Sequence, residues 1–118
     1  MFAYERSELI KVERQDLAER VEMVCRTLGD TAGFDIRSFD RNSYEEVHIE
    51  VKTSSGPVTT PFFMSAAEVE YARTCPKRYL IYRIYAYSPD SSEIEFCVIE
   101  RPAEALEFTP AIFRVRQK

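Results

Sequence analysis

Alternating hydrophobic and polar residues predict a sheet in the middle and later parts of the chain. Residues 34–39 and 46–53 both alternate with the period of a strand, and the polar residues 40–43 between them have the length of a hairpin turn. Two more strands are predicted at residues 79–87 and 93–99. We therefore expect a hairpin first and a second pair of strands later.

Helical signals flank the predicted hairpin on both sides. Residues 3–12 carry apolar side chains at mixed helical spacing and predict a first helix. Ser65 followed by Glu68 has the pattern of a capping box, which predicts a helix over residues 66–74 that ends before Pro76.

Shorter segments complete the expected order of elements. The sequence predicts a helical turn at 16–18, a strand at 20–26, a glycine turn at 28–33, a short apolar strand at 61–64, a short helix at 102–106 and a last strand at 112–115. Helices and strands in this order predict an α/β domain, with a mixed central sheet flanked by helices.

Length and composition limit the class of protein. The chain has 118 residues, of which 45% are hydrophobic and 31% charged, which suits one soluble domain over residues 1–118. No apolar run approaches the roughly 20 residues of a membrane helix, and the charged N-terminus does not resemble a secretory signal. We expect no membrane association and a cytoplasmic location.

Three cysteines without a CxxC pair, and one histidine, argue against structural zinc.

The net charge of the chain and the local distribution of its charges point in opposite directions on nucleic-acid binding. The net charge of −4 argues against a general binder of polyanions. Arg73, Lys77 and Arg78 nevertheless crowd the end of the second long helix and the strand after it, with Arg83 close behind. These residues are either a basic patch for nucleic acid or scattered surface charge.

The residues with the clearest chemistry are Asp35, Glu50 and Lys52. Alternate residues of a strand share a face, so Glu50 and Lys52 point the same way, about 7 Å apart, while Val51 points into the core. If Asp35 lies on the neighbouring strand, its carboxylate reaches the same place. Two carboxylates and the backbone carbonyl of Val51 are oxygen ligands suited to Mg²⁺, or to Mn²⁺ in its place. The alternative is a solvated hairpin face with a weak salt bridge.

His48 shares the predicted face of Glu50, two residues away. Its imidazole could assist a proton transfer or contact a phosphate, although a single histidine on a sheet is more often structural.

Four blocks of the sequence carry a family resemblance: GFDIRSF, HIEVKTSSG, TPFFMSAAEVEYAR and YLIYRIYAY. Together, over about residues 16–114, they resemble the C-terminal domain of the plant protein NO VEIN and its bacterial relatives, which are often attached to helicases or restriction genes. That family is similar to the PD-(D/E)xK nucleases. The resemblance implies a restriction-endonuclease-like core, in which Asp35 matches the motif aspartate, Glu50 the second acid and Lys52 the lysine.

The chain departs from that family at its first helix. The relatives carry a Gly-x-x-Gly-Glu-like stretch there, which is missing from this sequence, so the chain is expected to be a fragment or the C-terminal module of a larger protein. Glu5 or Glu8 is the candidate substitute for the missing acid.

The resemblance implies a Mg²⁺-dependent DNA endonuclease module of a restriction or defence system. It implies DNA as substrate, helicase or targeting domains as partners, and leaves room for a homodimer. The alternative is a degenerate relative that binds nucleic acid or proteins without cleavage.

Overall fold

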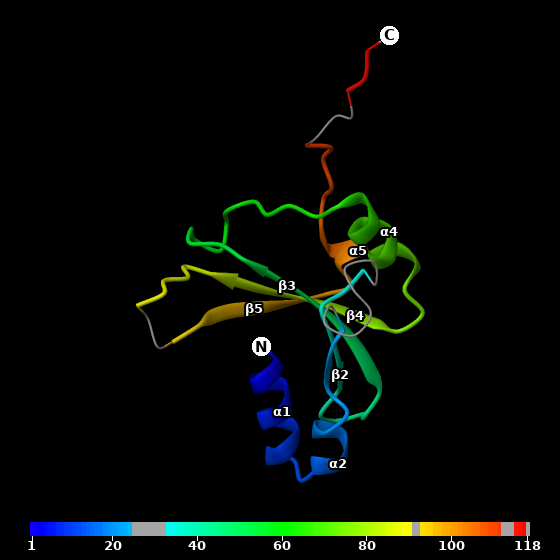
Figure 1. The fold of residues 1–118 in the computed structure, drawn as a ribbon, viewed down its shortest axis with the longest axis vertical. Helices are drawn as coiled ribbons and strands as arrows, with labels where there is room; N and C mark the ends of the chain where they lie inside the picture. Colours follow the sequence, from blue (N-terminus) through cyan, green and yellow to red (C-terminus); the bar gives the residue numbers. More distant parts are fainter. Residues whose placement is uncertain (25–32, 91–92, 112–114, 118) are drawn as a thin grey trace.

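The computed structural model describes residues 1–24, 33–90, 93–111 and 115–117 (Figure 1). Its helices and strands in chain order are α1 (Phe2–Lys11), α2 (Gln15–Ala18), β1 (Glu22–Met23), β2 (Ile36–Phe39), β3 (Glu46–Thr53), α4 (Ala66–Thr74), β4 (Arg78–Tyr85), β5 (Glu95–Glu100) and α5 (Pro102–Ala105). None of the helices in these ranges is long and apolar enough to cross a membrane.

The strands form one five-stranded sheet in which spatial order follows chain order. Strands β3 and β4 are parallel, and every other neighbouring pair is antiparallel. Parallel neighbours need a crossover connection, and α4 provides it. The predicted α/β class with a mixed sheet is confirmed, and the order of elements is compatible with a restriction-endonuclease-like core.

Helices cover both faces of the sheet and divide the core in two. Figure 1 shows α1 and α2 on one side, where Leu9 and Leu17 pack against residues such as Ile49. On the other side, Tyr71 of α4 packs against the second core group, which includes Ile81. Odd-numbered residues of β3 therefore face α1, and even-numbered residues face α4.

Alternation along the strands, and the apolar residues around α4, lead us to expect ten buried side chains, and most of them are buried. Five are 0–7% exposed: Ile36, Ile49, Leu80, Tyr82 and Ile84. Four more are partly buried: Val51, Phe62, Val69 and Phe96. The tenth, Val98, is 44% exposed and lies on β5, the edge strand of the sheet.

Some shorter elements differ from the expectation. Residues 61–64 are not a strand: Phe62 and Met64 pack against the core on the α4 side while Phe63 is 70% exposed, so their alternation reflects a connecting segment lying on that core. Of the strand expected at 20–26, the described part holds only Glu22–Met23. Residues 28–32 and 112–114, in the expected turn and last strand, lie outside the described residues.

The capping box at the start of α4 is confirmed. The Glu68 amide donates to Ser65 Oγ at 3.1 Å, and the Ser65 amide donates to Glu68 Oε1 at 2.7 Å. These two bonds satisfy backbone donors that a helix start leaves free, so they set where α4 begins.

Replacing Ile49 by Ala should destabilise the protein by about 2–5 kcal/mol, because its fully buried side chain would leave a cavity at the centre of the sheet. The free energy of unfolding in urea measures the loss. Val98→Ala is the control on the edge strand and should cost less than about 1 kcal/mol. Equal losses in the two variants would contradict the burial of Ile49 at the centre of the sheet and the exposure of Val98 at its edge.

Candidate functional site

The structure brings Asp35, Glu50 and Lys52 to one face of the sheet. Glu50 and Lys52 lie on the α4 face of β3. The pairing of Ile36 with Ile49 places Asp35, one residue before β2, opposite Glu50. Directly opposed residues of an antiparallel pair share a face, so the predicted grouping of the three side chains is present.

Asp35 is held by the backbone of β3. Its amide donates to the Ile49 carbonyl at 2.9 Å, and its Oδ2 accepts from the Val51 amide at 2.8 Å. Val51 lies beyond the last pair between β2 and β3, so the Asp35 carboxylate replaces a strand partner for it. The amide and carbonyl of a strand residue point to the same side, which places the Val51 carbonyl on the β2 side of β3.

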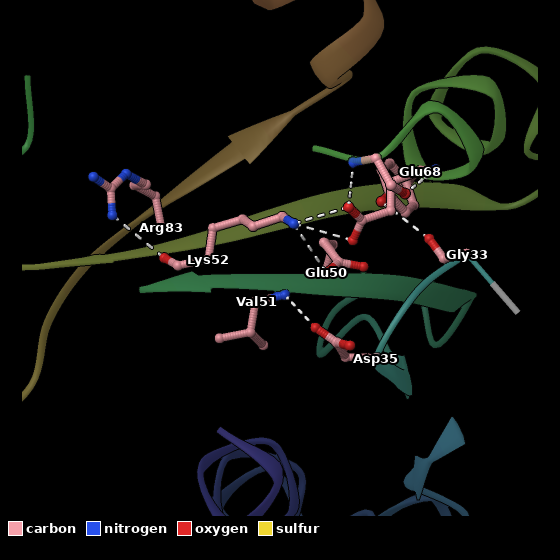
Figure 2. A network of polar contacts seen from close by, with 9 residues as sticks. Gly33, Asp35, Glu50, Val51, Lys52, Glu68 and Arg83 are labelled. Atoms are coloured by element: carbon pink, nitrogen blue, oxygen red, sulfur yellow. Dashed lines mark hydrogen bonds and ion pairs between the residues drawn. The ribbon is translucent and has the colours of Figure 1, made fainter. Parts of the chain in front are cut away.

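Lys52 joins the sheet to α4 through a third carboxylate (Figure 2). Its Nζ lies 3.0 Å from both carboxylate oxygens of Glu68 and 3.7 Å from Glu50 Oε1. The side chains of Glu50 and Lys52 are 6% and 17% exposed. The site is therefore mostly covered, and differs from the open cleft that a nuclease site is expected to have.

The two glutamates of the site, Glu50 and Glu68, differ in their protonation. The pKa of Glu50 is raised to about 9, chiefly by burial and also by the neighbouring Glu68 and Asp35 carboxylates. Burial also opposes ionisation of Glu68, but bonds from Glu50, the Ser65 amide and Lys52 bring the pKa of Glu68 below its ordinary value. At neutral pH, Glu50 holds a proton and Glu68 carries the charge that pairs with Lys52.

Glu68 is the residue that sequence analysis missed as a member of this site. Its only local signal is the capping box with Ser65, which explains the residue without any function. Its contact with Lys52 spans 16 positions in the chain and depends on how α4 crosses the sheet.

His48 lies on the same face but has other partners. Its ring stacks on Phe34 with centroids 4.0 Å apart, its Nε2 lies 2.8 Å from Glu46 Oε2, and its Nδ1 bonds the Tyr71 hydroxyl. Burial lowers the pKa of His48, although Glu46 acts in the opposite direction. Both ring nitrogens are thus engaged away from Glu50, and the expected accessory role finds no contact that would carry it.

Glu5 lies on the opposite face of the sheet, which corrects the expectation that it could join the site. It is fully buried, with its carboxylate accepting from the hydroxyls of Ser38 and Tyr82 at 2.8 and 2.6 Å and from Arg41 at 2.8 Å. Three donors hold this carboxylate under α1, so Glu5 is a structural group.

The expected basic patch is only partly available. Arg73 and Lys77 are exposed, and Arg73 lies over the ring of Phe108. Arg78 forms ion pairs with Asp40 and Glu100, which neutralise its charge. Arg83 is 1% exposed, so it does not belong to the surface patch.

The oxygen donors of Asp35, Glu50 and Val51 suit Mg²⁺, which usually takes one or two carboxylates and keeps several waters. Among the described residues, no group of three or more His, Cys, Asp or Glu side chains is arranged to hold a metal ion. The described residues therefore supply two carboxylates and one backbone carbonyl, but no prearranged metal site.

Comparison with known families matches residues 4–99 to the family described as Protein NO VEIN, C-terminal. The match covers most of the chain, which therefore belongs to this family. Neither a curated protein nor a solved structure matches the chain.

Glu50→Gln should change how stability depends on pH. Between its ordinary pKa of 4.5 and its raised pKa of about 9, Glu50 binds a proton in the folded chain that the unfolded chain has released. The contribution of this proton to the free energy of unfolding is complete at low pH and is lost as pH rises from about 4.5 to about 9. Glutamine has no proton to lose, so the variant should gain melting temperature relative to the parent as pH rises.

The melting temperatures are compared across that window in a chelating buffer. Glu45→Gln is the control, because Glu45 is exposed in the turn before β3. A constant difference between Glu50→Gln and the parent at every pH would show that Glu50 is ionised in the folded protein.

Proposed function

We propose that this chain is a Mg²⁺-dependent DNA endonuclease module. The observation that carries the proposal is the placement of Asp35, Glu50 and Lys52 on one sheet face, at the end of the strand that leads into the crossover helix. Two acids and a lysine are the side chains needed to hold a metal and stabilise a phosphoryl transition state. The resemblance of the family to PD-(D/E)xK nucleases supports the same roles.

Asp35, Glu50 and the Val51 carbonyl would hold the ion. Bound there, Mg²⁺ would polarise the scissile phosphate and lower the pKa of a bound water. Glu50 must release its proton before it can act as a ligand, so metal binding should strengthen as pH rises. Lys52 would move from Glu68 toward the phosphate and stabilise the negative charge that develops on it.

The partners follow from the family rather than from the site. We propose that helicase or targeting domains bring the module to DNA within a restriction-type system.

Plasmid cleavage in Mg²⁺ or Mn²⁺ tests the activity, with the full chain as the enzyme. Asp35→Asn is the sharper variant, because its amide oxygen can still accept from the Val51 amide while the ligand charge is lost. Lys52→Met removes the ammonium and keeps most of the side-chain volume. Each should lower cleavage by about 100-fold or more, as loss of a metal ligand or a charge-stabilising group does.

Lys11→Met is the matched control, since Lys11 is an exposed lysine on α1 whose partner is Glu8. Circular dichroism should show that all three variants fold. Undiminished cleavage in Asp35→Asn and Lys52→Met would show that the three residues have no catalytic role.

A second function, binding of nucleic acid without cleavage, is favoured by the ion pair between Lys52 and Glu68, which occupies the lysine. It predicts no cleavage by the parent chain, together with DNA binding that weakens steeply with salt. Arg73→Ala and Lys77→Ala should each reduce that salt dependence, by about one unit of slope for each phosphate that the variant no longer binds.

A further inference from the structure

Arg83 is a buried arginine whose hydrogen-bond acceptors are all neutral oxygens. Its Nη1 donates to the Ile84 carbonyl at 2.6 Å and to the Lys52 carbonyl at 3.4 Å. Its Nη2 donates to Ser54 Oγ at 2.7 Å and to the Thr60 carbonyl at 3.0 Å. Figure 2 shows its bond to the Lys52 backbone beside the acid site.

This burial is costly and is compensated only in part. A buried guanidinium is normally paired with a carboxylate, but within the described ranges none lies at salt-bridge distance from Arg83, and its buried Nε has no hydrogen-bond partner there. The ring of Phe62 lies 5.1 Å from its central carbon and adds a cation–π contact. What the guanidinium does provide is four bonds that converge from different parts of the chain.

Those bonds hold together the two ends of the segment that connects β3 to α4. Lys52 and Ser54 stand at the start of this connection, and Thr60 and Phe62 stand near its end, so Arg83 contacts both. Three positions beyond Phe62 begins the capping box that contains Glu68. One side chain thus links the strand that carries Lys52 to the segment that leads to the partner of Lys52.

The connection is also hydrogen-bonded to the end of β4 and to the residue after it. The Ser54 amide donates to the Ile84 carbonyl at 3.0 Å, and the Ala86 amide donates to the Gly56 carbonyl at 2.8 Å. A Cβ on Gly56 would lie 2.4 Å from Thr60 Oγ1, so a larger residue there would require the Thr60 side chain to shift. The segment therefore has a defined shape, with Arg83 at its centre.

We infer that Arg83 is a positioning residue: by holding Ser54 and Thr60 together at the end of β3, it keeps Lys52 between Glu50 and Glu68. The catalytic consequence rests on the proposed nuclease function, whereas the positioning of Lys52 does not. Lysine cannot replace this arginine, because a single ammonium cannot reproduce the planar fork that reaches four acceptors.

Two variants test the inference in the full chain. Arg83→Lys keeps the charge and removes the fork, and Ser54→Ala removes one bond at the surface of the network, so it should fold even if the first does not. Thermolysin cleavage within residues 54–62 reports the order of the connection, and acetylation of Lys52, followed by mass spectrometry, reports the ion pair. Loss of a bond to a charged group should raise both rates by about tenfold.

Arg41→Met is the matched control. Arg41 also has a buried, unpartnered Nε among the described residues, but it bonds Glu5 on the opposite face. It should lower global stability and leave the cleavage of residues 54–62 and the acetylation of Lys52 unchanged, which separates positioning from general loosening.

The inference is overturned if Ser54→Ala and any folded Arg83→Lys protein show the parent rates, or if Arg41→Met raises both rates equally. Where the parent cuts DNA, Arg83→Lys should lower kcat with little change in DNA affinity. If no protein cuts DNA while the two rates still rise, the nuclease proposal fails and the positioning role of Arg83 stands.

Discussion

The site depends on the ion pair that joins Lys52 of β3 to Glu68 of α4. A lysine at the covered end of a strand needs a carboxylate, and the N3 position of the crossover helix supplies one. The same carboxylate accepts from the Ser65 amide, so one side chain fixes both the beginning of α4 and the direction of Lys52. Because helix start and site share this group, the polar cluster and the packing of α4 are one structural unit.

The two faces of the sheet use carboxylates in opposite ways. Under α1, Glu5 is surrounded by three donors and cannot offer oxygens to a metal without losing them. Under α4, Glu50 keeps a proton because burial, together with the neighbouring Glu68 and Asp35 carboxylates, raises its pKa. The two faces therefore accommodate a buried carboxylate by different means: hydrogen-bond donors surround Glu5, whereas Glu50 retains its proton.

The candidate site is covered rather than open. Glu50 is nearly inaccessible, and two oxygens of Glu68 hold Lys52, so any ligand that reaches these groups has to displace existing contacts. The ion pair of Lys52 with Glu68 and the proton on Glu50 reduce the negative charge of this face. His48 lies on the same face but serves as a packed aromatic group, with its ring stacked on Phe34.

The sequence by itself determined strands β2 to β5, the hairpin, the start of α4 and the common face of Asp35, Glu50 and Lys52. Each of these follows from local periodicity, or from a capping pattern four residues long. The tertiary structure alone decided that Glu68 binds Lys52, that Glu5 lies on the other face and that Arg83 is buried. Those outcomes depend on side chains brought together by the crossover from β3 to β4 and by the packing of α1, and a local pattern does not specify which distant residue will meet it. The local sequence around a charged residue therefore does not show whether its side chain will be exposed, as that of Lys77 is, or buried, as that of Arg83 is.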